Sequence, residues 1–187
     1  MVCNYTVFAQ EKSSCVPESI LALGAGSSKD AVTNAVKNMD GITTISSNEQ
    51  NPLAQDYKKN ATTNETLIYK INSGNCFRGN NTLIRFEFEN GKLFKAYITT
   101  QFANVDYYDM QDNFNALRNM LKASFENEKQ TKKTSGTLIS NGYTFSNKRN
   151  KAKTELTYIS GKEKKGIYLL QLSWINERNE GIETILY

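Results

Sequence analysis

Histidine is absent from the 187-residue chain, and its absence excludes several kinds of active site. Ser-His-Asp and Cys-His arrangements need an imidazole, and many zinc sites use histidine as a ligand. Only carboxylates, lysine, tyrosine or an unassisted cysteine remain for catalysis. Because these residue types form no recognisable catalytic motif in the sequence, we expect no catalytic residues, no metal, no cofactor and no enzymatic activity.

Cysteine is scarce as well. The three cysteines, Cys3, Cys15 and Cys76, have no C-x-x-C spacing, which excludes a zinc or thioredoxin-like motif. If the protein is exported, we expect a Cys15–Cys76 disulfide that clamps the N-terminal segment to the sheet. The alternative is a set of free thiols.

Long hydrophobic runs are also missing, so no segment reaches the roughly 20 apolar residues of a membrane-spanning helix. Mean hydropathy is -0.57, while 39% hydrophobic residues suffice for a core. Residues 1–10 resemble the end of a signal peptide, because an apolar stretch closes in small residues before a polar segment. We expect an exported protein, periplasmic or secreted, that is soluble and monomeric.

Charge is unevenly distributed over the chain. Residues 1–93 contain nine basic and nine acidic residues, so the net charge of +4 lies entirely in the second half. Residues 122–165 contain eleven basic and four acidic residues, a local net charge of +7. This region is either a solvated basic face or a surface for phosphates or an acidic partner.

The clearest structural signal is a β-hairpin over residues 82–101, with its turn at Asn90-Gly91. We predict a three-residue loop with Gly91 as a left-handed bulge, which pairs residues whose numbers sum to 180. This register places one set of residues on the apolar face: Ile84, Phe86, Phe88, Phe94, Ala96 and Ile98. It places a second set on the polar face: Arg85, Glu87, Glu89 and Lys95.

Hydrophobic periodicity predicts two helices. The first covers Lys29–Met39 and is capped by Ser27 or Ser28. The second covers Tyr107–Glu126, is capped by Asp109 or Asp112, and has a core stripe at helical spacing. The stripe comprises Met110, Phe114, Leu117, Leu121 and Phe125.

β-Branched and aromatic residues predict the remaining strands. We expect them at 42–45, 66–71, 137–145, 154–160 and 167–175. We predict an N-terminal linker at 11–27 and a lysine-rich loop at 128–135.

The two halves share the same order of elements. Residues 28–102 and 103–187 each predict a helix followed by an antiparallel meander, which favours an α+β fold with the helices packed on one face of the sheet. We interpret them as two tandem repeats within one compact domain.

This layout resembles the β-lactamase-inhibitor-protein-like fold, which a small outer-membrane assembly lipoprotein family shares through a hairpin matched by Phe88–Leu93. It is also similar to small secreted proteins of Bacteroidetes, through Phe77–Gly79, Phe86–Phe88 and Asn90–Leu93. The resemblance implies a fold and transfers no functional residue.

We expect a non-enzymatic binding protein whose partner is a protein or glycan of the cell envelope. Aromatic side chains dominate binding hot spots, and the candidates are Tyr107, Tyr108, Tyr143 and Trp174. For each of them, a place in the core or at the rim of the site is the competing interpretation.

Two alternatives have different chemistry. Polyanions or single-stranded nucleic acid would bind Lys148, Arg149, Lys151 and Lys153 beside the aromatic residues Tyr143 and Phe145. Nucleic acid is disfavoured because an exported protein rarely meets it. A carboxylate-based hydrolase would use Glu87 and Glu89, which two-carboxylate chemistry would have to hold about 5–10 Å apart.

Overall fold

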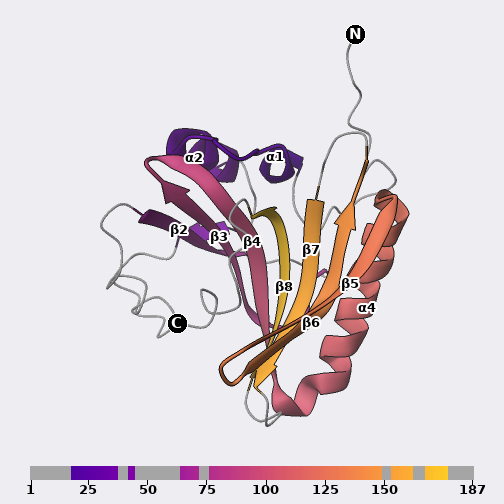
Figure 1. The fold of residues 1–187 in the computed structure, drawn as a ribbon. Coiled ribbons are helices and arrows are strands. Elements are labelled where there is room, and N and C mark those ends of the chain that lie inside the picture. The colour runs from indigo at the N-terminus through magenta and orange to yellow at the C-terminus, as the bar shows by residue number, and fades with distance from the viewer. Residues whose placement is uncertain are drawn as a thin grey trace.

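The computed structural model describes residues 18–37, 42–44, 64–71, 76–148, 153–161 and 167–176. The signal-like segment 1–10 lies outside them. Within this part of the chain the fold is α+β, with one eight-stranded antiparallel sheet in the order β1-β2-β3-β4-β8-β7-β6-β5 (Figure 1).

The strands in chain order are β1 (Ile42–Thr44), β2 (Asn64–Ile71), β3 (Asn80–Glu89), β4 (Lys92–Ala103), β5 (Asn127–Ser135), β6 (Leu138–Ser146), β7 (Lys153–Gly161) and β8 (Ile167–Asn176). The helical elements are α1 (Glu18–Leu21), α2 (Lys29–Lys37), the 3-10 turn η2 (Asn104–Asp106) and α4 (Tyr107–Ser124). The predicted strands are therefore confirmed. The two meanders form one continuous sheet because β4 pairs with β8.

One main hydrophobic core contains residues from helices and strands alike. Ile20 of α1, Val36 of α2 and Leu117 of α4 belong to the same buried cluster as Phe86 and Leu170 of the sheet. In Figure 1, α1 and α2 lie beside the β2–β4 half, and α4 lies beside the β5–β7 half. The interpretation as two tandem repeats stays a prediction.

The N-terminal elements agree only in part with the sequence. Helix α2 begins where expected, and Ser28 Oγ accepts a hydrogen bond from the Ala31 N–H at 3.2 Å, which satisfies a donor of the first turn. The predicted linker 11–27, however, includes helix α1. Its Ile20 side chain is fully buried, so this segment contributes to the core.

Helix α4 confirms the second predicted helix and its core stripe from Met110 to Leu121. The predicted caps are wrong, because Asp109 lies inside the first turn and Asp106 occupies the N-cap position without a side-chain hydrogen bond. Phe125 has extended backbone, and its N–H caps the helix at the Leu121 carbonyl.

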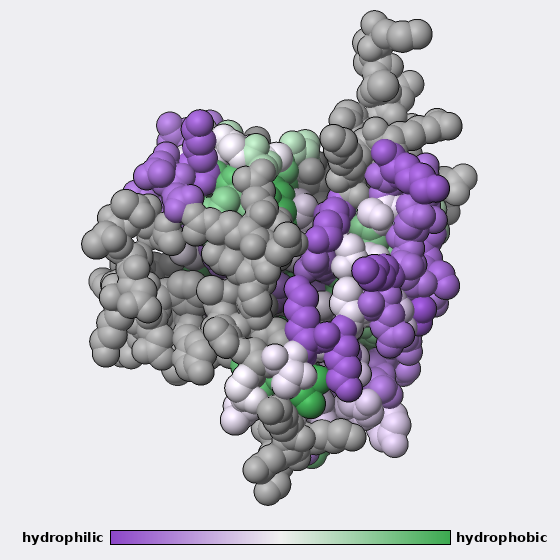
Figure 2. Space-filling model, in the orientation of Figure 1, coloured by the Kyte–Doolittle hydropathy of each residue, from purple (hydrophilic) through white to green (hydrophobic). Residues whose placement is uncertain are grey.

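The predicted loop 128–135 is wrong as well, because it forms strand β5. Nine consecutive residue pairs join β5 to β6. This pairing provides hydrogen-bond partners for the backbone N–H and C=O groups of the segment, although its side chains are mostly exposed and polar. Since β5 is the last strand of the sheet, its lysines are typical of a protected edge. Figure 2 shows hydrophilic side chains gathered over β5 and α4.

The turn between β3 and β4 differs from the prediction of a three-residue loop. Asn90 (φ 51°) and Gly91 (φ 73°) both have left-handed backbone, and Glu89 pairs directly with Lys92. These are the features of a two-residue type I′ turn, whose twist matches that of the flanking strands. The predicted sum of 180 is therefore wrong, since the pairs next to the turn sum to 181.

A bulge beyond the turn restores the predicted faces. Phe88 pairs with Leu93, but Glu87 pairs with Lys95, so Phe94 is an extra residue of β4. The pairs from Glu87–Lys95 to Leu83–Thr99 sum to 182, which places Glu87 opposite Lys95. The apolar face is confirmed for every predicted member except Phe94, which lies outside the main core.

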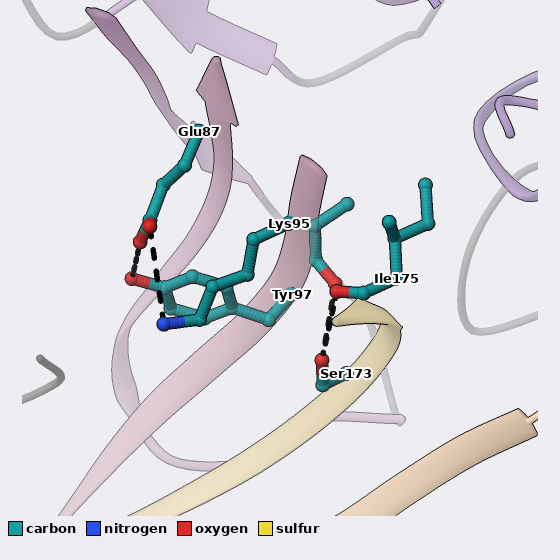
Figure 3. Close-up of polar contacts among 6 residues, drawn as sticks. Glu87, Lys95, Tyr97, Ser173 and Ile175 are labelled. Carbon is teal, nitrogen blue, oxygen red and sulfur yellow. Dashed lines mark hydrogen bonds and ion pairs between the residues drawn. The ribbon is translucent and has the colours of Figure 1, made fainter. Parts of the chain in front are cut away.

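A second bulge lies on β8. Ala96 pairs with Ile175 and Tyr97 with Ser173, so Trp174 is the extra residue. Ser173 Oγ compensates for the interrupted ladder, because it donates toward the carbonyls of Ala96 (3.4 Å) and Ile175 (3.3 Å) (Figure 3). The bulge thus brings both Trp174 and Ile175 to the core.

Candidate functional site

The aromatic candidates divide between surface and core. Tyr108 is exposed, whereas Tyr107 is half-buried and packs between Tyr108 and Tyr168, with ring centroids 5.8 and 5.2 Å away. Gln111 Nε2 also donates to the Tyr107 hydroxyl at 2.5 Å. Tyr107 is therefore held in place by Tyr168 and Gln111, and it packs against the exposed ring of Tyr108.

Tyr143 lies on the side of β6 that faces α4. The Arg118 guanidinium lies 3.8 Å from its ring centroid, and Arg118 Nε donates to Glu128 Oε1 at 2.6 Å. This hydrogen bond is the main cause that raises the pKa of Arg118 and lowers that of Glu128. The three side chains hold α4 against β5 and β6, and Tyr143 is a structural contact there.

The same side of the sheet contains the other aromatic candidates. Phe145 is fully buried, so it is not available for stacking on a base. Trp174 packs edge-on against Phe86 at 6.4 Å, and its buried indole N–H has no hydrogen-bond partner within the described residues. Tyr158 is half-buried in this layer, where burial and its tyrosine neighbours raise its pKa.

The predicted basic cluster is described in part. Lys148 is exposed, and its N–H donates to Glu126 Oε2 at 3.1 Å. Arg149 and Lys151 lie outside the described residues. The basic surface predicted for this loop therefore stays a prediction.

The predicted disulfide is likewise described at one end. Cys76 is disulfide-bonded, and Cys15 lies outside the described residues, so the pairing with Cys15 stays a prediction. Asn113 of α4 holds the segment that contains Cys76, because its side chain bonds to the Cys76 carbonyl and the Arg78 N–H.

A buried polar cluster lies on the sheet face opposite the main core (Figure 3). The Tyr97 hydroxyl donates to Glu87 Oε1 at 2.8 Å, and Lys95 Nζ lies 3.8 Å from Glu87 Oε2. Lys95 is 1% exposed and Glu87 5%. The Glu87–Lys95 register across β3 and β4 causes this encounter, and it exists only because of the bulge at Phe94.

The geometry of this cluster favours a structural role over hydrolysis. A catalytic carboxylate must reach the substrate, whereas Glu87 is enclosed and engaged by an ammonium group and a phenol. Glu89, the second carboxylate of the hypothesis, is half-buried near the end of β3. Within the described residues, no group of three or more metal-ligating side chains is placed to hold an ion.

Exposed hydrophobic side chains concentrate at one end of the sheet. Four large ones are exposed within the described residues: Val105 (87%), Tyr108 (78%), Ile167 (57%) and Met120 (37%). The first three flank the junction between β4, η2 and α4, because Ile167 opens β8 opposite Ala103, the last residue of β4. We call Val105, Tyr108 and Ile167 the apolar end.

Of these three residues, the sequence reasoning identified Tyr108 and missed the aliphatic pair. Val105 and Ile167 are 62 positions apart in the chain, so only the β4–β8 pairing brings them to the same end. The composition of each segment on its own contains no such signal.

Comparisons with known proteins add no relative. No family model, no curated protein and no solved structure matches the chain. Among the described residues, no helix combines the length and the hydrophobicity that crossing a membrane requires.

Proposed function

We propose that this chain is a non-enzymatic binding protein that acts outside the cytoplasm and captures a protein partner through its apolar end. The observation that carries the proposal is the concentration of exposed hydrophobic side chains. Three of the four large ones exposed in the described residues lie at one end of the sheet. Gathered apolar surface of this kind marks interaction sites, whereas single exposed residues are ordinary.

The apolar end is also preorganised for binding. Tyr108 packs edge-on against Tyr107 at 5.8 Å, and Tyr107 is held by Tyr168 and by Gln111. A ring that is already fixed loses little side-chain entropy when a partner covers it. Tyrosine is moreover one of the residue types enriched in binding hot spots.

The composition of the apolar end favours a protein over a glycan as its occupant. Val105 and Ile167 offer branched aliphatic surface, which is stabilised by burial against other apolar groups. A sugar presents hydroxyl groups that such side chains cannot satisfy with hydrogen bonds. A protein surface with an apolar centre and a polar rim fits this composition.

Export is supported by the disulfide at Cys76, because disulfides persist in oxidising compartments and are rare in the cytosol.

The element order supports the proposed tandem arrangement, since α2 precedes β1–β4 and α4 precedes β5–β8. The shared core, which includes Val36 and Leu117, supports the packing of the helices on one face of the sheet.

A photo-crosslinking experiment tests the proposed function. A benzophenone amino acid replaces Tyr108 in one variant and Met120 in another, since Met120 is exposed on α4 outside the apolar end. We expect one crosslinked protein from an envelope or secreted fraction with the label at 108, and its loss in the added variant Ile167→Asp. No product, or the same products from both labels, would contradict the proposal.

The compartment is tested separately by the intact mass of the native protein before and after reduction and alkylation. A shortened N-terminus together with an intramolecular disulfide supports export. A retained Met1 together with three free thiols would rule it out.

A further inference from the structure

Three carboxylates lie beside the exposed residues Val105 and Tyr108 at the start of α4. Asp109 and Asp112 are exposed, and Asp106 is half-buried at the N-cap. Residues 96–117 contain these three acidic residues and no basic one, so the segment has a net charge of -3 in a chain whose net charge is +4. We call Asp106, Asp109 and Asp112 the acidic flank of the apolar end.

Helix spacing brings Asp112 next to Tyr108. Asp112 follows Tyr108 by four residues in α4, so the two side chains are neighbours on one face of the helix. Both are exposed, whereas the core stripe with Met110 and Phe114 is buried. A partner that covers the ring of Tyr108 therefore comes within reach of the Asp112 carboxylate.

The charge of the acidic flank is not neutralised within the described residues. None of its three carboxylates forms an ion pair or a side-chain hydrogen bond there. Arg118, the next basic residue of α4, pairs instead with Glu128. Arg78 is held near α4 through its N–H on Asn113, and it pairs with none of the three. An anionic surface of this kind attracts cationic groups of a partner.

Stabilisation of the helix accounts for only part of this arrangement. Carboxylates at the start of a helix interact favourably with its dipole, which is a sufficient reason for Asp106 and Asp109. This effect falls off beyond the first turn, whereas Asp112 is the sixth residue of α4. The Asp112 carboxylate is therefore available to a partner.

The β8 side of the apolar end has the opposite charge in the sequence. Lys162, Lys164 and Lys165 precede Ile167 in the chain, and they lie outside the described residues. The acidic flank thus belongs to the α4 side alone. A partner that matches it is basic at the point where it meets α4.

We infer that the partner captured at the apolar end is a protein segment that combines apolar side chains with lysine or arginine, and that its basic residues lie over the acidic flank. The inference rests on the proposed function and adds the chemistry of the partner. Apolar side chains of the segment would cover Val105 and Tyr108, where burial of apolar surface supplies affinity. Its cations would lie at the solvated rim beside Asp112, where charge determines specificity and the rate of association more than affinity.

Fluorescence anisotropy with three labelled peptides tests the charge of the partner. The peptides share the apolar centre Leu-Phe-Leu and differ in the residues on each side of it, which are two lysines, two glutamines or two glutamates. We expect the lysine peptide to bind at least tenfold more tightly than the glutamate peptide at low salt, and added salt to reduce this preference. The test is stringent, because the net charge of +4 on the whole chain would by itself favour the glutamate peptide.

Variants locate the effect on the acidic flank. Asp112→Asn should weaken binding of the lysine peptide about threefold, and the double variant with Asp109→Asn about tenfold, as exposed charge pairs imply. Asp30→Asn is the matched control, since Asp30 is an exposed carboxylate in the first turn of α2. Helix α2 adjoins the start of β4 through the Ser28–Lys92 bridge, whereas the acidic flank follows the end of β4 (Figure 1). The two ends of this strand are roughly 35 Å apart, so Asp30→Asn should change binding less than about 1.5-fold.

Three results would overturn the inference: equal binding of the lysine and glutamate peptides, equal effects of Asp112→Asn and Asp30→Asn, or no binding of any peptide at low salt. Binding of the lysine peptide that is unchanged in Tyr108→Ala would do so as well, because the peptide would then not occupy the apolar end. Circular dichroism of each variant shows whether it is folded.

The inference and the proposed function can fail separately. A protein that still crosslinks to the label at position 108, but whose yield is unaffected by Asp112→Asn and by salt, would contradict only the basic character of the partner. The absence of any crosslinked protein would contradict the proposed function itself.

Discussion

The side-chain amide of Asn113 donates to the Cys76 carbonyl oxygen at 2.6 Å and thereby joins helix α4 to the segment before β3. Its Oδ1 also accepts the Arg78 N–H at 3.0 Å. Asn113 is fully buried on a helix face that otherwise packs apolar side chains. It is therefore a polar connection between two segments 37 residues apart.

We expect Asn113→Ala to lower the free energy of unfolding by about 2 kcal/mol, because it removes two partly buried hydrogen bonds, one to the Cys76 carbonyl and one from the Arg78 N–H. Urea denaturation of the oxidised protein measures the change. Asn115→Ala is a matched control, since Asn115 is exposed on the same helix. Equal stability of the two variants would show that the Asn113 hydrogen bonds contribute little.

The hydrogen bond between Tyr97 and Glu87 is expected to stabilise the centre of the sheet. Tyr97→Phe should cost about 2 kcal/mol, because a buried bond to a charged acceptor is lost. A double-mutant cycle with Glu87→Ala, which removes the acceptor, isolates the pair from the other contacts of each residue. A coupling free energy near zero would contradict the proposed strength of the bond.

The Arg118–Glu128 pair is expected to stabilise the fold in a pH-dependent manner. Its hydrogen bond lowers the pKa of Glu128 below the ordinary value of 4.5, so the native state favours the ionised carboxylate. This stabilisation is fully present above the unfolded-state pKa and is lost as the pH falls through the lowered folded-state pKa. We expect Glu128→Gln to cost about 1 kcal/mol at neutral pH and progressively less in acid.

The control for that measurement is Glu65→Gln. Glu65 pairs with Lys29 at the same 2.6 Å, but its side chain is 59% exposed against 21% for Glu128. Solvent screens such a pair, so its removal should change stability little. If Glu128→Gln lowers stability by a constant amount from neutral to acidic pH, the assignment to ionisation of Glu128 is wrong.

Gly142 is expected to tolerate no larger residue. An added Cβ would lie 2.1 Å from the Leu156 carbonyl oxygen and 2.7 Å from Thr157 Cα, both backbone atoms. Gly142→Ala should therefore cost about 2 kcal/mol or more through displacement of β6 from β7. In Gly24→Ala the added methyl has no neighbour within 4 Å, so thermal unfolding should be nearly unchanged. Similar melting temperatures for both variants would refute the close approach of β6 and β7.

The sequence predicted those elements whose signal is local. The α4 stripe from Met110 to Leu121 repeats at helical spacing, and the type of turn residue at Asn90-Gly91 placed the hairpin correctly. Where two structures satisfy the same local pattern, prediction failed. The turn length depended on a bulge at Phe94, and the lysine-rich segment 127–135 pairs through its backbone, which its polar composition does not reveal.

The sequence by itself determined the α+β composition, the apolar face of the central hairpin and the absence of histidine chemistry, since these follow from residue type and spacing. The tertiary structure decided which distant residues meet. The β4–β8 pairing brought Ile167 to the end where Val105 and Tyr108 are exposed. It also placed Thr99 of β4 opposite Gln171 of β8. Such contacts depend on strand order and register, which the packing of the whole chain establishes.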